Sequence, residues 1–142
     1  MVIKEIKELS NSNHKRIISL LPQLTTKKID VTKESLSEII KSNSSLLLGA
    51  FENGELVGIL TLVVYQIPTG KFGRIEDVVV DINFRGKNIG EKLSLEAIRI
   101  AKEINIKRLF LTSNPYRLEA NKLYQKIGFT LGETNSYFYD IE

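Results

Sequence analysis

A turn that could seat a diphosphate lies in the middle of this sequence, between a predicted strand and a predicted helix. Residues 75–80 are rich in β-branched types, whereas from Ile89 onward apolar residues recur at helical spacing. The first turn of a helix exposes backbone N–H groups and the positive end of its dipole. Gly86 and Gly90 let an anion approach this backbone closely, and basic residues flank the first glycine. The pattern predicts a pyrophosphate site.

Three side chains are candidates for proton transfer. Glu76 and Asp77 are neighbours on the predicted strand, so we expect them to point to opposite faces and not to form a paired dyad. Each is equally well explained as a solvated surface charge. Tyr124 lies in a predicted amphipathic helix, where a tyrosine is commonly a core residue whose hydroxyl bonds a nearby acceptor. The alternative is that its phenol donates a proton.

The composition excludes several classes of function. The 142 residues contain no cysteine, so disulfides, thiolate metal sites and a cysteine nucleophile are all excluded. Because His14 is the single histidine, we predict no metal site. The net charge of +3 comes from basic residues scattered among acids, so we expect no nucleic-acid partner.

The chain is expected to form one domain, residues 1–142, in the cytoplasm. Its hydrophobic fraction of 42% and charged fraction of 26% are ordinary for a globular protein. No apolar run is long enough to cross a bilayer, so we expect no membrane partner. Residues 1–9 alternate apolar and charged types, which suits a strand and differs from the continuous apolar stretch of a signal peptide.

Strands and helices alternate along the chain to position these residues. Asn53-Gly54 is a strong hairpin signal, Thr32 is a candidate helix cap and Gly128 a candidate helix stop. The predicted strands are residues 2–9, 45–51, 56–65, a strand ending at Val80, 107–112, 129–131 and 135–139, and the predicted helices are 14–21, 33–40, 88–103 and 115–127. The predicted class is mixed α/β, in the order β-α-α-β-β-β-α-β-α-β-β.

The central turn resembles the acetyl-coenzyme A signature of the Gcn5-related N-acetyltransferases (GNAT), Gln/Arg-x-x-Gly-x-Gly/Ala. Arg85 and Gly90 match its ends, and Asn88 stands where its middle glycine falls. Asparagine tolerates left-handed backbone, and it is also a good helix cap, here with Glu91 three positions later as in a capping box. The Walker and dinucleotide-binding patterns are not matched.

A second segment resembles the late helix of the same family, Ala-x-x-Leu-Tyr-x-x-x-Gly-Phe. The matching residues are Ala120, Leu123, Tyr124, Gly128 and Phe129. The family often has an asparagine three places before this alanine. That position is Arg117 here, and Asn114 is the candidate to replace it. The two segments lie in the family's order, and the resemblance covers residues 75–129.

The resemblance implies a GNAT-like fold, with a central mixed sheet flanked by helices, and acetyl transfer from acetyl-CoA to a primary amine of a small molecule or peptide. Because cysteine is absent, direct attack in a ternary complex is expected. Glu76 is the implied general base, with Asp77 or a water as alternatives. Tyr124 is the implied acid for the departing thiolate, since a phenol and a thiol have pKa values of about 10 and about 8.5. The implied coenzyme-binding residues are Val78, Val79, Val80, Arg85, Gly86, Lys87, Asn88, Ile89, Gly90, Glu91, Asn114, Asn121 and Tyr124.

Other functions stay open at this point. A non-catalytic acetyl-CoA sensor or interaction module would keep the turn but would not need Tyr124 or Glu76. A protein N-terminal or lysine acetyltransferase would need an open groove. Residues 76–80 and 85–87 also resemble glucosamine-phosphate acetyltransferases, but only in segments that bind the coenzyme. The identity of the amine and the choice between monomer and homodimer are not predicted.

Overall fold

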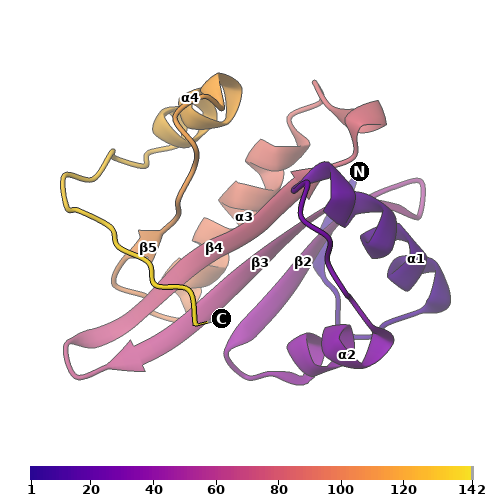
Figure 1. Cartoon of the computed structure of the whole chain (residues 1–142), viewed down its shortest axis with the longest axis horizontal. Helices are drawn as coiled ribbons and strands as arrows, with labels where there is room; N and C mark the ends of the chain where they lie inside the picture. The colour runs from indigo at the N-terminus through magenta and orange to yellow at the C-terminus, as the bar shows by residue number, and fades with distance from the viewer. Residues whose placement is uncertain (142) are drawn as a thin grey trace. The chain divides into compact units, whose positions relative to one another are not determined.

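The computed structural model describes residues 1–141, which divide into two compact units, residues 1–112 and the residues from Ser113 onward. The first unit holds a five-stranded sheet in the order β1-β2-β3-β4-β5 (Figure 1). Its elements are β1 (Val2–Glu5), α1 (Asn11–Leu20), the 3-10 helix η1 (Leu21–Gln23), α2 (Lys33–Lys41), β2 (Ser45–Glu52), β3 (Glu55–Ile67), β4 (Gly70–Val80), the 3-10 helix η2 (Ile82–Phe84), α3 (Ile89–Glu103) and β5 (Leu109–Phe110). The second unit, as far as Ile141, contains α4 (Leu118–Lys126). The assignment of residues 1–142 to one domain stays a prediction.

The sheet of the first unit is mixed. Strands β1 to β4 pair antiparallel with their neighbours, and β5 pairs parallel to β4. A parallel pair needs a crossover connection, and α3 lies in that connection. The predicted mixed α/β class is therefore confirmed.

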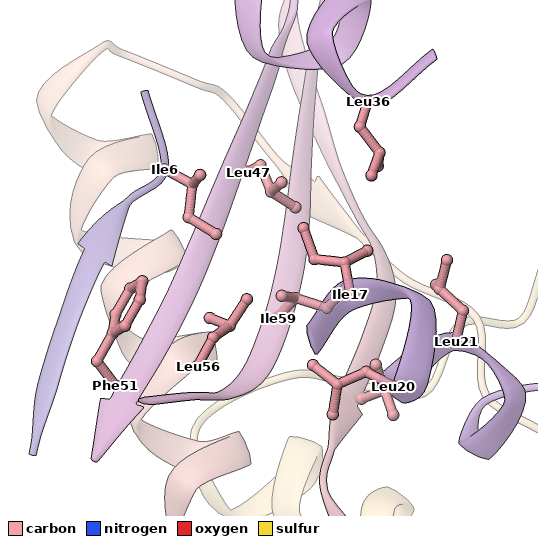
Figure 2. Close-up of a cluster of buried hydrophobic side chains, with 10 residues drawn as sticks. Ile6, Ile17, Leu20, Leu21, Leu36, Leu47, Phe51, Leu56 and Ile59 are labelled. Atoms are coloured by element: carbon pink, nitrogen blue, oxygen red, sulfur yellow. The ribbon is translucent and has the colours of Figure 1, made fainter. Parts of the chain in front are cut away.

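Helices pack on both faces of this sheet. On one face, Ile17 and Leu20 of α1 cluster with Leu36 of α2 and with sheet residues such as Ile59 (Figure 2). On the other face lies α3, because a Cβ added to Gly58 would come within 3.3 Å of Leu93. Neighbouring residues of a strand point to opposite faces, so β3 contributes to both apolar layers.

Local sequence explains where two of these elements begin or end. Thr32 caps α2: its hydroxyl accepts from the Ser35 N–H at 3.0 Å, and the Ser35 hydroxyl accepts from the Thr32 N–H at 3.1 Å. Asn53 and Gly54 join β2 to β3 with φ of 49° and 81°, as a tight hairpin turn requires. Both predictions are confirmed.

The predicted closing strands at residues 129–131 and 135–139 are wrong. These residues form no strand in the described chain, and Tyr137 and Tyr139 are each 87% exposed. A strand needs a hydrogen-bonded neighbour, and a run of aromatic residues alone does not supply one. The nine earlier predicted elements are present in the predicted order, although residues 107–112 form a strand only at Leu109–Phe110.

Candidate active site

Strand β4 carries a bulge at its acidic residues. Ile59 pairs with Val79 and Thr61 pairs with Glu76, so three steps along β4 face two steps along β3. Asp77 lies inside this segment with a φ of 52°, in the left-handed region. The regular strand alternation that we expected for Glu76 and Asp77 is therefore wrong at this point.

The edge of β4 that faces β5 is open beyond its first residues. β5 pairs with β4 only at Gly73 and Arg74, and no other strand within residues 1–141 pairs with that edge. Main-chain N–H groups on an unpaired strand edge are available to an extended ligand. Residues 78–80, predicted to bind the coenzyme through their backbone, lie on this open stretch of β4.

Two carboxylates lie at the bulge, Glu76 at its start and Asp77 within it. The Nε of Arg74 donates to the Oε1 of Glu76 at 2.9 Å, and both side chains are about half exposed. Partial burial of the Asp77 carboxylate, together with the nearby charge of Glu76, raises the pKa of Asp77 above its usual value. A carboxylate with a raised pKa accepts a proton more readily near neutral pH. Both candidates for the general base therefore lie on the open stretch of β4.

The turn after β4 is held by contacts of its own side chains. The Nε of Arg85 donates to the carbonyl of Val80 at 3.0 Å, which folds the turn back on the end of the strand. The ammonium of Lys87 lies 5.3 Å from the centroid of the Phe84 ring. Gly86 has a φ of 83°, a conformation that other residue types rarely adopt.

Helix α3 begins without a side-chain cap at Asn88. The residue has a φ of 61°, so the predicted left-handed backbone is confirmed. Its side chain accepts no capping hydrogen bond, so the predicted capping box with Glu91 is wrong. A capping side chain needs extended backbone at the cap position, and left-handed backbone turns it away. The Asn88 side chain therefore does not occupy the backbone N–H groups of the first turn of α3.

These features fit a diphosphate. A Cβ built on Gly86 would meet no atom within 4 Å, so no other part of the chain crowds the turn at this residue. Gly86 and Asn88 both have left-handed backbone. Turns in which right- and left-handed residues alternate can direct their backbone N–H groups toward a common side, as in anion-binding loops. Arg85 and Lys87 are exposed and supply positive charge. The first unit therefore brings residues 78–80 and 85–91 together along one path from β4 to α3.

Tyr124 lies in α4 of the second unit. Its side chain is buried, and its ring makes an edge contact with Phe129, with centroids 5.9 Å apart. Burial raises the pKa of the phenol, an effect that the positive charge of Arg117 partly opposes. Gly128 ends the helix with a φ of 114°, which confirms it as the helix stop. The phenol is therefore protonated at neutral pH.

The two predicted coenzyme-binding asparagines of the second unit bond to the same short loop. The side-chain amide of Asn121 donates to the carbonyl of Asn114 at 2.9 Å, which holds the loop against α4. The Asn114 amide donates to the hydroxyl of Tyr116 at 3.0 Å. Arg117, at the position where the family often has asparagine, precedes α4 without capping it by its side chain. The coenzyme contacts of Asn114 and Asn121 stay predictions.

Sequence reasoning missed a buried ion pair at the start of the turn. Asp81 is 4% exposed and binds Arg16 of α1, with 2.6 Å between the guanidinium Nη2 and Oδ2. Its Oδ1 also accepts from the N–H of Asn83 at 3.0 Å. The signal in the sequence was an aspartate directly after a strand, where such side chains fold turns, but Arg16 is too distant in sequence to be matched to it.

The described residues include neither a candidate membrane span nor a candidate metal site. No helix among residues 1–141 is both long and apolar enough to cross a membrane. In the same part of the chain, no three acidic or histidine side chains gather in a way that would hold a metal ion.

Comparisons with known proteins show similarity to acetyltransferases. An acetyltransferase (GNAT) family model matches residues 10–129. A probable spermine N(1)-acetyltransferase of Bacillus subtilis subsp. natto (strain BEST195) is 26% identical over 130 residues, covering 87% of this chain and 86% of that protein. The probable glucosamine 6-phosphate N-acetyltransferase 2 of Oryza sativa subsp. japonica is 38% identical over 60 residues, which cover 42% of this chain. That match spans 34% of the rice protein's length.

A solved structure shows the same fold. The crystal structure of glucosamine-6-phosphate N-acetyltransferase from Arabidopsis thaliana aligns with a TM-score of 0.80 at 26% sequence identity. The alignment covers 98% of this chain and 99% of that one.

Proposed function

The chain belongs to the acetyltransferase (GNAT) family, whose cosubstrate is acetyl-CoA, and on this premise we propose that it acetylates a primary amine by direct attack within a ternary complex. The observation that carries the proposal is the turn at residues 85–90, with open space over Gly86 and an uncapped helix start. Acetyl-CoA supplies the acetyl group as an activated thioester. The chain has no cysteine that could form an acetyl-enzyme thioester, so direct attack of the amine on the coenzyme thioester is the simplest course.

Backbone amides of the first unit would hold the coenzyme. Residues 86–91 would bind its pyrophosphate, and residues 78–80 would bind the pantetheine arm along the open edge of β4. The β4 amides next to the thioester would also polarise its carbonyl. Asn114 and Asn121 would bind the coenzyme from the second unit.

A carboxylate on β4 would take the proton from the attacking amine. Glu76 is our first choice as the base, acting directly or through a water, and Asp77 is its competitor because its pKa is raised. The ion pair between Glu76 and Arg74 fixes the direction of the Glu76 carboxylate. Tyr124 would give its proton to the departing thiolate.

The acceptor is proposed to be a small molecule with a primary amine. The names of two relatives, a spermine and a glucosamine 6-phosphate acetyltransferase, describe amines of this kind. Acetylation of a protein N-terminus or lysine, or binding of acetyl-CoA as a sensor without catalysis, would be the alternatives. A cytoplasmic location and a monomer or homodimer stay predictions.

The test is thiol release from acetyl-CoA with spermine, glucosamine 6-phosphate and a lysine peptide as acceptors. We expect turnover with one of the small amines, and loss of most of it in Glu76→Gln but not in the surface control Glu103→Gln. If Asp77→Asn is the variant that loses turnover, Asp77 is the base. Binding of acetyl-CoA without turnover on any amine would favour the sensor function. No binding at all would contradict the proposal.

A further inference from the structure

An ion pair shielded from water joins α1 to the end of β4. The guanidinium of Arg16 donates from Nη2 to the Oδ2 of Asp81 at 2.6 Å and from Nε to the carbonyl of Leu56 at 2.8 Å. The Arg16 side chain is 23% exposed and that of Asp81 only 6% exposed. Two directed bonds from one planar guanidinium fix the position of Asp81 against the start of β3.

Asp81 also anchors the turn that follows it through a hydrogen bond. Its second oxygen, Oδ1, accepts from the Asn83 N–H at 3.0 Å, which starts η2. The next residue, Ile82, donates its N–H to the Oε1 of Gln23 at 2.8 Å. The first residues of the turn are therefore attached to both α1 and η1, which are distant in sequence.

The attached residues lead directly into the proposed pyrophosphate site. Arg85 and Gly86 follow four and five positions after Asp81. A loop that is ordered before binding loses less conformational freedom when its ligand arrives, which increases affinity without any added contact to the ligand. Arg16 itself is paired with Asp81 and with Glu55 and donates to the main chain, so its charge is already matched within the protein.

We propose that Arg16 is a positioning residue for the coenzyme: through Asp81 it holds the turn at residues 82–90 in the shape that binds the pyrophosphate. This inference rests on the proposed function. It assigns Arg16 no contact with either substrate and no part in proton transfer.

The experiment compares Arg16→Met with Arg99→Met. Arg99 is also ion-paired, with Glu96 and Glu103 on the surface of α3, so its loss removes the same side chain at a place remote from the turn. We expect the Kd and the KM for acetyl-CoA to rise about tenfold in Arg16→Met, which corresponds to about 1.4 kcal/mol. The kcat at saturating acetyl-CoA and the KM for the amine should stay unchanged, as should all constants of Arg99→Met.

Amide hydrogen exchange gives a readout that does not depend on activity. In Arg16→Met, exchange should quicken at residues 82–90 while the middle of β3 stays protected. Where Arg16→Met does not fold because Asp81 is left buried without a partner, the double variant Arg16→Met/Asp81→Asn gives the same test. It removes the buried carboxylate, and Glu55, the other carboxylate that pairs with Arg16, is exposed to water.

The outcomes separate the two proposals. Unchanged affinity for acetyl-CoA in the Arg16 variants, with a wild-type protein that binds it, would overturn the positioning role alone. If the wild-type protein binds no acetyl-CoA, the proposed function fails. In that case, equal rates of amide hydrogen exchange at residues 82–90 in both arginine variants would overturn the positioning role as well. A lower melting temperature with neither change would also overturn it, because it would show a purely structural pair.

Discussion

At the scale of single residues, Tyr124 is the side chain whose environment says most about its chemistry. The substitution Tyr124→Phe keeps the ring packed against Phe129 and removes only the hydroxyl. We expect kcat to fall by about 10²-fold or more, as when a general acid is lost. The KM for acetyl-CoA should change little. Steady-state thiol release checks this, with the exposed Tyr139→Phe as the control, and an equal kcat in both variants would show that Tyr124 is a core residue only.

The pH dependence of this residue follows from its burial. The pKa of Tyr124 is raised, so the phenol keeps its proton at neutral pH and loses it only as the pH rises through that raised value. The usual pKa of a phenol is about 10. Activity that depends on the protonated phenol should therefore persist beyond that pH and decline only at higher pH. A kcat profile measured up to alkaline pH tests this, and the decline should be missing from the residual activity of Tyr124→Phe.

At the scale of elements, the turn between β4 and α3 carries a conformation that only glycine adopts easily. Gly86 has a φ of 83° and Gly54, in the β2–β3 turn, a φ of 81°, and a Cβ at either position meets no atom within 4 Å. Replacing either by alanine should cost about 1–2 kcal/mol of stability through backbone strain. Only Gly86→Ala should also weaken the binding of acetyl-CoA. Urea unfolding and calorimetry measure the two effects, and equal affinity in both variants would exclude the turn as the coenzyme site.

The ion pair between Arg16 of α1 and Asp81 at the end of β4 should make the free energy of unfolding depend on pH in acid. Hydrogen bonds from Asn83 and Arg16 lower the pKa of Asp81 below its usual value. A lowered folded-state pKa contributes stability that is complete above the unfolded value of about 3.9 and is lost as the pH falls through the folded value. The free energy of unfolding of wild type should therefore exceed that of Asp81→Asn by about 1–2 kcal/mol at pH 7. This difference should shrink below about pH 4, and a difference that does not change with pH would contradict the assignment.

At the scale of the whole molecule, the structure differs from the sequence-based prediction in the residues after α4. The sequence predicted strands at 129–131 and 135–139, whereas the structure has no strand there. Amides at residues 130–141 should accordingly exchange quickly in the free protein. Protection of alternate amides at residues 135–139 would show that closing strands form.

How much could be predicted depended on how local each signal was. The hairpin at Asn53-Gly54, the cap at Thr32 and the stop at Gly128 depend on a few adjacent residues, and all three are confirmed. The pairing of Arg16 with Asp81 depends on tertiary packing, so no local sequence pattern predicts it. The bulge at Asp77 depends on the register with β3, which residue types alone do not determine.

That bulge makes a single-codon deletion informative. Without Asp77, Glu76 and Val79 would be separated by one residue, as their partners Thr61 and Ile59 are, so the ladder to β3 would run without interruption. The shortened chain should melt no lower than the parent, yet it would lack the bulge that precedes residues 78–80, which are proposed to bind the pantetheine arm. It would thus be a folded but inactive counterpart, and substantial residual turnover in it would show that the irregularity is dispensable.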